Sequence, residues 1–339
     1  MFRVSKNLLS VLAFAVLMVV APFLLANDYY ISVLILASIN ALIVIGLNLL
    51  LGYAGQISLG HAAFFGLAAY MTAISTVTWG MPIWLGMILG VALSAIVGYV
   101  IAVPTLKLKG HYLAMATLGF GIIVYIVFNE TIELTGGPSG FIGIPRLELL
   151  GFTFESDLSY YYVMVVTLVL GVLFALNLID SRTGRALRAI HVSEKAAASM
   201  GVNITGYKRF IFVLSAVFAG VAGVLYAHYL GFIAPSSFGF HFSVQLITMV
   251  VLGGMASVWG AVAGAFFLTT LPEFLRVLED VDILVYGLIM ILCMIYLPGG
   301  IAGGLESLFR RVRQFFSTKS AQPTDSDSAD QDNGGARVR

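Results

Sequence analysis

Residues Gly52–Tyr70 read GYAGQISLGHAAFFGLAAY, in a chain that is otherwise mostly Leu, Val, Ile and Ala. The stretch holds four glycines, a glutamine, a serine and a histidine. Polar groups and interrupted helices are costly in hydrocarbon unless they are buried in protein or line a water-filled route. The stretch therefore predicts either a polar segment along such a route, or a surface loop that leads into a glycine-rich packing helix.

The composition of the whole chain places it in a membrane. Of 339 residues, 60% are hydrophobic and 10% are charged, and the mean hydropathy is +0.98. A soluble domain carries roughly 25% charged residues, so this chain has too few to cover a water-facing surface. Its single cysteine, Cys293, excludes an internal disulfide and a thiolate metal cluster.

Apolar runs long enough to cross a bilayer predict an all-α, polytopic transmembrane helical bundle of about ten spans. The first run resembles a signal peptide, but its poor cleavage site favours an uncleaved span. The eighth and ninth runs are short and interrupted by glycine, so they are either two tilted spans or one re-entrant pair. The ten runs lie near residues 8–26, 31–51, 57–79, 83–103, 112–129, 159–179, 209–230, 242–256, 259–273 and 283–300.

Charged residues in the connections predict the orientation. With ten spans, the N-terminus and the basic connections at 105–111, 181–208 and 308–314 all fall on one side, which the positive-inside rule makes cytoplasmic. The acidic connection Glu130–Ser159 then lies outside. Residues 1–316 are predicted to form the membrane domain, and residues 317–339 a disordered cytoplasmic tail.

Small residues recur every fourth position in the fourth run, at Gly86, Gly90, Ser94 and Gly98. On a helix they form one stripe along which a neighbouring backbone can approach closely. The pattern predicts tight helix packing and carries no information about a substrate.

The loop 181–208 is long for a connection and is predicted to be helical. Its segment RALRAIHVSEKAAASMG has strong helix formers and ends at Gly201, a natural C-cap. The apolar positions recur at helical steps, so the helix could lie on lipid or dock into a partner protein. The alanine-rich end favours docking, because alanine buries little area in a membrane.

One catalytic pattern deserves comparison. The segment GPSG at Gly137–Gly140 matches the G-x-S-G of rhomboid-type intramembrane serine proteases, with His228 as the partner that Ser139 would need. Because the segment sits in a Gly/Pro turn and opens no apolar helix, a turn is the better interpretation. The chain has no P-loop and no metal-ligand spacing, and its predicted spans are poor in carboxylates, which argues against an ion-driven carrier.

Several long segments together resemble the LivM-type permease subunits of branched-chain amino-acid ABC importers. The resemblance covers nearly the whole chain apart from the tail. It is carried by Leu47–Tyr70, Leu106–Phe120, Thr135–Pro145, Arg182–Ala216, Gly223–Phe240, Val250–Ala265 and Tyr296–Gly303.

The resemblance implies an ABC permease fold in the bacterial inner membrane, with both termini cytoplasmic. It implies pairing with a second homologous permease, two cytoplasmic ATPase subunits and an external solute-binding protein. ATP and Mg²⁺ would be bound by the ATPases, and this chain would bind no cofactor, no metal and no nucleic acid. A permease for urea or short amides is the alternative, and a hydrolase at Ser139 a weaker one.

The same resemblance assigns roles to residues. The loop would carry a coupling helix similar to the EAA-x-x-x-G element of ABC permeases, although Glu194 stands one place before the acidic position of that motif. The coupling residues implied are Arg185, Glu194, Lys195, Ala196, Ala197 and Gly201. The residues expected to line or shape the translocation pathway are Gly52, Gly55, Gln56, Ser58, Gly60 and His61.

Overall fold

The computed structural model describes residues 2–24, 27–108, 110–149 and 152–275, with residues 287, 288, 291, 295, 300, 301 and 303. The basic segment 308–314, the tail 317–339 and most of the predicted last span lie outside the described residues.

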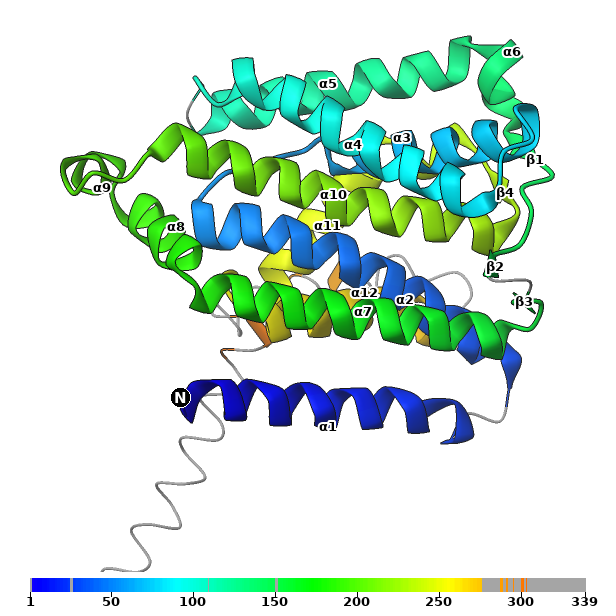
Figure 1. Cartoon of the computed structure of the whole chain (residues 1–339), viewed down its shortest axis with the longest axis horizontal. Coiled ribbons are helices and arrows are strands. Elements are labelled where there is room, and N and C mark those ends of the chain that lie inside the picture. The colour runs from blue at the N-terminus through cyan, green and yellow to red at the C-terminus, as the bar shows by residue number, and fades with distance from the viewer. Residues whose placement is uncertain are drawn as a thin grey trace, which may run out of the picture.

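The described part of the chain is a helical bundle with four short strands (Figure 1). Strand β1 (Phe141–Ile142) pairs with β4 (Phe232–Ile233), and β2 (Glu148–Leu149) pairs with β3 (Phe152–Thr153), both antiparallel. These small ribbons were not predicted. The α-helices are α1 Phe2–Leu24, α2 Asp28–Asn48, α3 His61–Ala73, α4 Ile83–Thr105, α5 His111–Glu130, α6 Ile132–Thr135, α7 Asp157–Asp180, α8 Arg182–Val192, α9 Glu194–Ser199, α10 Ile204–Leu230, α11 Phe240–Gly253 and α12 Val258–Leu275. Two π-helical segments, η1 Leu49–Tyr53 and η2 Ile74–Thr78, continue α2 and α3. Two short 3₁₀ helices are η3 Gly137–Ser139 and η4 Pro235–Phe238.

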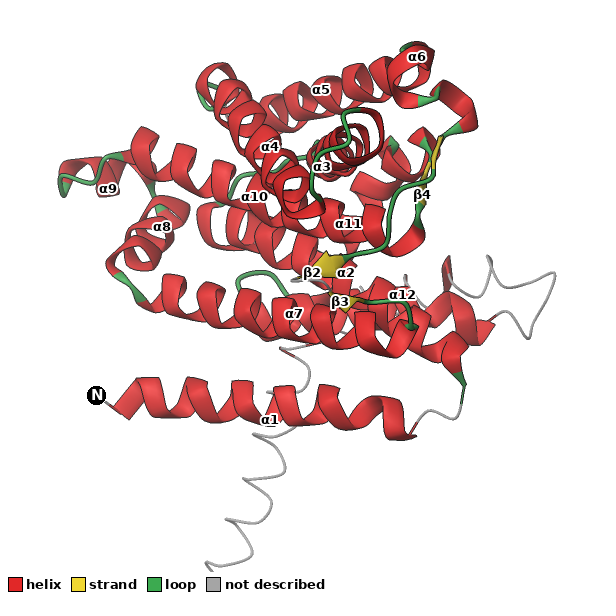
Figure 2. Ribbon diagram, turned by 45° about the vertical axis from the view of Figure 1, so that its right-hand side comes forward, coloured by secondary structure: helices red, strands yellow, loops and turns green. Residues whose placement is uncertain are grey.

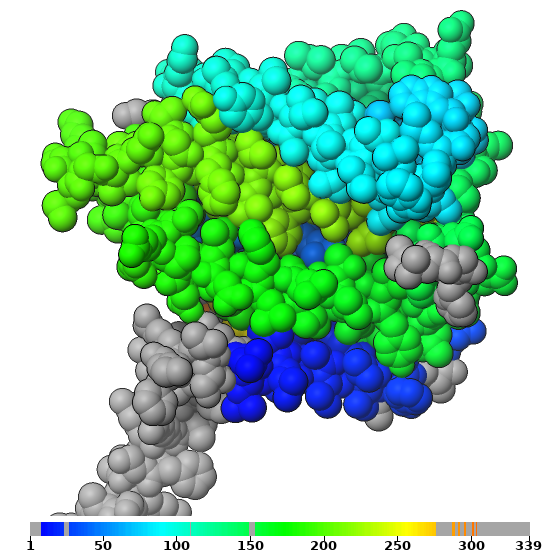
Figure 3. Space-filling view, in the orientation of Figure 1, coloured from blue at the N-terminus to red at the C-terminus, as the bar shows by residue number. Residues whose placement is uncertain are grey.

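Helix α2 forms the centre of the bundle. It packs against α7, α10 and α12, and 83% of its most apolar stretch is buried. In the space-filling view only a small part of it shows between α10 and α7 (Figure 3). An all-round apolar helix such as this one is typical of a bundle interior.

Helices α3, α4 and α10 form a second packed group, which Figure 2 shows with α3 enclosed beneath α4. The small residues of α4 are the reason for the close approach. A methyl group on Gly90 would lie 2.7 Å from the carbonyl oxygen of Ala68 in α3. The hydroxyl of Ser94 donates to the carbonyl of Phe64 at 2.6 Å, and a methyl on Gly98 would lie 2.8 Å from Cβ of Ala216 in α10. Gly86 faces Ser75 in the same way.

The two ends of the bundle differ in charge. The N-terminal end of α1, the α4–α5 connection and the pair α8–α9 lie at one end (Figure 1), which we call the basic end. The acidic connection between α5 and α7 lies at the other, which we call the acidic end. The described connections therefore segregate by charge as the positive-inside pattern requires.

The predicted number of spans is not established by the structure. Six described helices are long and apolar enough to cross a membrane, and two shorter apolar helices cover Leu8–Phe23 and Phe240–Gly253. The helix within the third predicted span begins at His61 instead of residue 57, because residues 55–60 are not helical. The eighth and ninth are two antiparallel helices, the short α11 and the longer α12.

Candidate functional site

The segment 55–60 enters the bundle from the basic end without helical structure. At its start Gly55 has φ +66°, a conformation that glycine adopts without strain. A side chain there would lie 3.4 Å from Nδ1 of His191 in α8. The next residue, Gln56, donates its backbone N–H to the carbonyl of Leu50 at 3.1 Å. Its side chain is only 2% exposed, and neither amide atom has a hydrogen-bond partner in the described chain.

His61, the first residue of α3, is held from two sides. Its Nδ1 lies 3.1 Å from the hydroxyl of Ser58, and its Nε2 lies 2.7 Å from the hydroxyl of Ser215 in α10. Both His61 and Ser58 are 1% exposed. These two side chains therefore fix the backbone of the segment and, in the isolated subunit, face no open space.

The start of α3 lies at membrane depth. Ser215 is eleven residues beyond Ile204, the start of α10, which places it about 16 Å along that helix. At the same level, the N–H of Leu59 donates to the hydroxyl of Thr117 in α5 at 3.0 Å. The N–H of Ala62 donates to the hydroxyl of Ser243 in α11 at 3.2 Å. Neighbouring side chains thus satisfy backbone donors at a helix N-terminus inside the bundle, as burial in hydrocarbon requires.

Helix α11 is arranged in the opposite sense. The chain returns from the acidic end through β4 and η4, and α11 begins at Phe240 beside the N-terminus of α3. From there α11 runs to the basic end, where Gly253 packs so closely on Gly260 that no side chain fits. The structure therefore contains two helices whose N-terminal ends meet inside the bundle and whose C-terminal ends point to opposite sides. They are the 14-residue α11 and α3, which continues through η2 to Thr78.

The turn after α11 is fastened to α2. The side-chain amide of Asn48 donates to the carbonyl of Ser257 at 2.7 Å, and its oxygen accepts from the N–H of Ala256 at 3.0 Å. Gly52 lies against this turn, and a methyl on it would lie 2.9 Å from Cα of Ala256. Gly60 is equally close to α5, because a methyl on it would lie 2.8 Å from the carbonyl oxygen of Thr117. Both glycines are required for close backbone approach.

The predicted coupling helix consists of two helices. Ser193 interrupts it between α8 and α9, because its hydroxyl caps α9 by accepting from the N–H of Ala196 at 3.3 Å. The predicted end at Gly201 is correct, since φ there is +80°. Glu194 forms an ion pair with Lys208 of α10 at 2.5 Å, so it joins α9 to the bundle. On α8, the guanidinium of Arg185 donates to the carbonyl of Asp180 at 3.3 Å.

The outer surface of α8–α9 carries apolar side chains at the basic end of the molecule. Val192 and Met200 are each 85% exposed, and Lys195 and Ala196 are exposed beside them. Ala197, in contrast, is turned into the chain and 3% exposed. The structure therefore separates the predicted coupling residues into an exposed set and a packed one.

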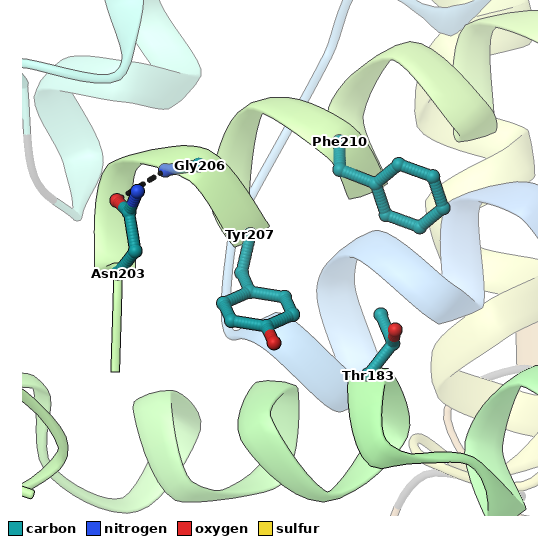
Figure 4. A pocket seen from close by; sticks show the side chains of 5 residues that line it. All are labelled: Thr183, Asn203, Gly206, Tyr207 and Phe210. Atoms are coloured by element: carbon teal, nitrogen blue, oxygen red, sulfur yellow. Dashed lines mark hydrogen bonds between the residues drawn. The ribbon is translucent and has the colours of Figure 1, made fainter. Parts of the chain in front are cut away.

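Beside this element an open hollow of about 400 Å³ separates the start of α8 from the start of α10. Tyr207 and Phe210 of α10 point across it toward Thr183 of α8 (Figure 4). Asn203 closes its edge by accepting from the N–H of Gly206 at 3.0 Å. Because this hollow separates the start of α8 from α10, α8 contacts the bundle mainly through α7. The α8 side chains Leu187 and Ile190 are buried.

The weaker alternative, a hydrolase at Ser139, lacks the required geometry. Ser139 is exposed in a 3₁₀ turn. Both ring nitrogens of His228 are occupied: Nδ1 lies 2.8 Å from the carbonyl oxygen of Pro145 and Nε2 lies 3.1 Å from the hydroxyl of Thr72. The imidazole therefore has no nitrogen left for a nucleophile. Among the described residues, no three His, Cys, Asp or Glu side chains gather in a way that could hold a metal ion.

The sequence did not predict which residues contact the polar cluster, which consists of Gly52, Gly55, Gln56, Ser58, Gly60 and His61. The contacting residues lie on four different helices, and a buried serine, threonine or asparagine gives no spacing that shows which segment it contacts. The only signal was their polarity within a span. They are Asn48, Thr117, Ser215 and Ser243.

A helical bundle in which helix N-termini meet in the interior is an architecture found in multi-pass transport proteins. Comparison with known sequences makes this specific. Residues 29–294 match the family model described as "Branched-chain amino acid transport system / permease component", and the chain belongs to this family.

Individual relatives agree with the family match. The chain is 33% identical over 319 residues to the high-affinity branched-chain amino acid transport system permease protein LivM of Salmonella typhimurium, covering 87% of this chain and 75% of that protein. It is 30% identical to BraD of Pseudomonas aeruginosa, over 80% of this chain and 94% of that one. It is 27% identical to LivH of Escherichia coli, over 80% and 93%. No solved structure matches the chain.

Proposed function

We propose that this chain is one half of the translocation pathway of an ATP-driven importer for branched-chain amino acids. The observation that supports this most strongly is its 33% identity to LivM across most of the membrane domain. The weaker similarity to LivH suggests that its partner in the membrane is a second, homologous permease. Two cytoplasmic ATPase subunits bind ATP and Mg²⁺, and an external binding protein delivers the solute. The membrane is the bacterial inner membrane, with the basic end and both termini in the cytoplasm.

The polar cluster would shape the pathway. Gly52, Gly55 and Gly60 let the backbone leave the helical path and approach α11, α8 and α5 in turn. Ser58 and His61 hold the start of α3 in place. Gln56 is the member of the cluster with unpaired hydrogen-bonding atoms, and a buried unpaired amide calls for a partner such as water or solute. Weak binding suits a conduit, because tight binding would prevent release.

The exposed surface of α8–α9 would receive the ATPase. Val192 and Met200 stand at the basic end, where α8 and α9 project from the bundle (Figure 1). Apolar residues so exposed to water favour a protein contact. The ion pair between Glu194 and Lys208 would transmit movement of α9 to α10, and α10 packs along α3. ATP binding would then bias the inward- and outward-facing states through this connection.

Reconstitution tests the proposal. The complete complex is placed in lipid vesicles with its binding protein, and uptake of labelled leucine is measured with ATP and with a non-hydrolysable analogue. We expect uptake only with ATP. Uptake of urea or short amides in place of leucine would support the alternative solute class. Ser139→Ala should leave leucine uptake unchanged. Loss of uptake in this variant would instead support the hydrolase alternative at Ser139.

A further inference from the structure

Helix α11 carries a stripe of polar side chains on its outer face. His241, Gln245 and Thr248 are spaced four and three residues apart, which places them on one side of the helix. His241 is exposed, and Gln245 and Thr248 are half-buried. The opposite side packs into the bundle through buried residues such as Leu246 and Met249. We call the three residues the α11 stripe.

The α11 stripe lies at membrane depth. Helix α11 begins where Ser243 meets the N-terminus of α3. It ends at Gly253, whose neighbouring turn is bound to Asn48 at the basic end. Its 14 residues span about 21 Å. The stripe therefore runs from the middle of the bundle toward its basic end.

Lipid is a poor neighbour for this surface. Ionisable and amide side chains inside spans face the protein interior or a water-filled cavity. The other outer helices conform to that rule with apolar surfaces. Examples of their exposed residues are Ile88 and Ile96 on α4, Ile123 and Ile126 on α5, and Val166 and Leu170 on α7. The α11 stripe differs from all three surfaces.

A small hollow lies where the N-terminal ends of α3 and α11 meet. It is lined by residues of α3, α5 and α11, among them Ala62, Gly121, Gly239, Phe240 and Ser243, and by none of the three stripe residues. The N-terminal ends of helices carry partial positive charge, and in transport proteins such ends face anionic groups of solutes. The hollow lies at the N-terminal end of α11, and the stripe runs along the outer face of the same helix.

We propose that the α11 stripe lines the translocation pathway, on the side that faces the second permease, and hydrogen-bonds the passing amino acid. This inference rests on the proposed function. The Gln245 amide can donate to a carboxylate or accept from an ammonium group. The Thr248 hydroxyl donates to the carbonyl of Val244 at 2.9 Å, so its lone pairs remain for an ammonium donor. Three weak contacts in a row suit passage without retention.

Cysteine labelling tests this in the complete complex. Cys293, the only cysteine of this chain, is replaced by serine, and Gln245→Cys is compared with Val166→Cys, a lipid-facing control that is 59% exposed. Both are treated with a charged, membrane-impermeant methanethiosulfonate in inverted vesicles. We expect Gln245→Cys to react at least about tenfold faster, because the charged reagent does not enter hydrocarbon. Leucine transport with ATP and binding protein should slow that reaction.

Equal, slow reaction at both positions would show a dry surface and overturn the proposal. A second measurement uses Gln245→Leu and the control Val166→Leu. We expect leucine uptake to fall by about fivefold in the first, the equivalent of one hydrogen bond, and not in the second. Normal uptake and assembly of Gln245→Leu would also overturn it. If Gln245→Cys reacts rapidly but the unmodified complex transports no leucine, the α11 stripe stands as a water-lined pathway and the proposed solute is wrong.

Discussion

The imidazole of His61 is bonded at both ring nitrogens, to Ser58 and Ser215, and is closed off from solvent in the subunit. A polar residue at membrane depth can therefore serve the backbone by fixing where a helix begins. Gln56, five residues earlier, is equally buried but unpaired. At the scale of single residues, hydrogen-bond pairing distinguishes a positioning side chain from one available to a solute.

Ser215→Ala removes one partner of His61 and leaves Nε2 buried and unpaired. We expect the subunit to lose about 1 kcal/mol of stability, the order of an interhelical hydrogen bond in a membrane. Thermal unfolding of the complex in nanodiscs measures this. The control is Thr167→Val in α7, because Thr167 bonds only to the carbonyl of its own helix at Val163. An equal effect of both changes would contradict the role of the His61–Ser215 bond.

Gln56→Leu separates transport from stability. The substitution replaces a buried, unpaired amide by an apolar side chain of similar size, so thermal stability should be unchanged or higher. Leucine uptake should fall by about fivefold if the amide hydrogen-bonds the solute or its water. Unchanged uptake would mean that Gln56 has no part in the pathway.

The sequence predicted the polar cluster but could not divide it by role. Gln56, Ser58 and His61 look alike in a motif, because spacing does not reveal which neighbours they meet. The partners Ser215 and Ser243 come from helices more than 150 residues away, and a lone serine in an apolar run has no readable pattern.

At the scale of elements, close backbone contacts fix where α3 begins and where α11 ends. Helix α2 could have continued into α3, but Gly52 and Gly55 let the chain turn past α11 and α8. Glycine is costly within a helix and favourable at such contacts. The predicted runs 57–79 and 242–256 each contain a helix, but the helices begin and end elsewhere, since hydropathy measures apolar length and ignores helix breaks.

Gly52→Ala should displace the α11–α12 turn, because its methyl would meet the backbone of Ala256 and the side chain of Asn48. We expect lower thermal stability and reduced uptake. Gly119→Ala is the matched control for stability, since no atom lies within 4 Å of a methyl placed there. If Gly52→Ala is as stable as the control, the turn is not fastened as described.

The pair Glu194–Lys208 should couple α9 to α10. Glu194→Lys places two cations together, and we expect assembly with the ATPase to persist while ATP-driven uptake is largely lost. The double exchange Glu194→Lys with Lys208→Glu restores the pair and should restore part of the uptake. Lys107→Glu, which changes an exposed charge at the basic end outside α8–α9, is the control for charge alone. Failure of the double exchange to improve on the single one would exclude the pair as the coupling contact.

The sequence predicted a helical coupling element and its end at Gly201, but not the break at Ser193. Helix propensity is continuous through this segment, and the break depends on Ser193 capping α9 while Lys208 holds Glu194. The inward position of Ala197 likewise follows from this packing. Substitutions meant to test ATPase docking belong at Val192, Ala196 or Met200.

At the scale of the whole molecule, the positive connections gather at one end and the acidic connection at the other (Figure 1). The sequence predicted this separation, because the order of the spans and the charges of the connections together indicate on which side each connection lies. The total number of spans stays a prediction, since the last run lies outside the described residues.

Labelling of intact cells checks the orientation. In the Cys293→Ser background, we expect Ser139→Cys to react with an impermeant thiol reagent added outside, because the positive-inside rule predicts that the acidic end faces outward. Met200→Cys should react only in inverted vesicles. Each variant is the control for the other. Reaction of Met200→Cys in intact cells would reverse the topology and remove the cytoplasmic docking surface.

The place where α3 begins also constrains how the subunit is made. The N–H of Leu59 bonds to Thr117 in α5 and that of Ala62 to Ser243 in α11, and exposed peptide groups are not tolerated in lipid. The segment 55–60 leaves the ribosome long before α11 exists to complete this cap. Insertion therefore cannot proceed strictly one helix after another, and the nascent polypeptide must be sheltered until its C-terminal third has arrived.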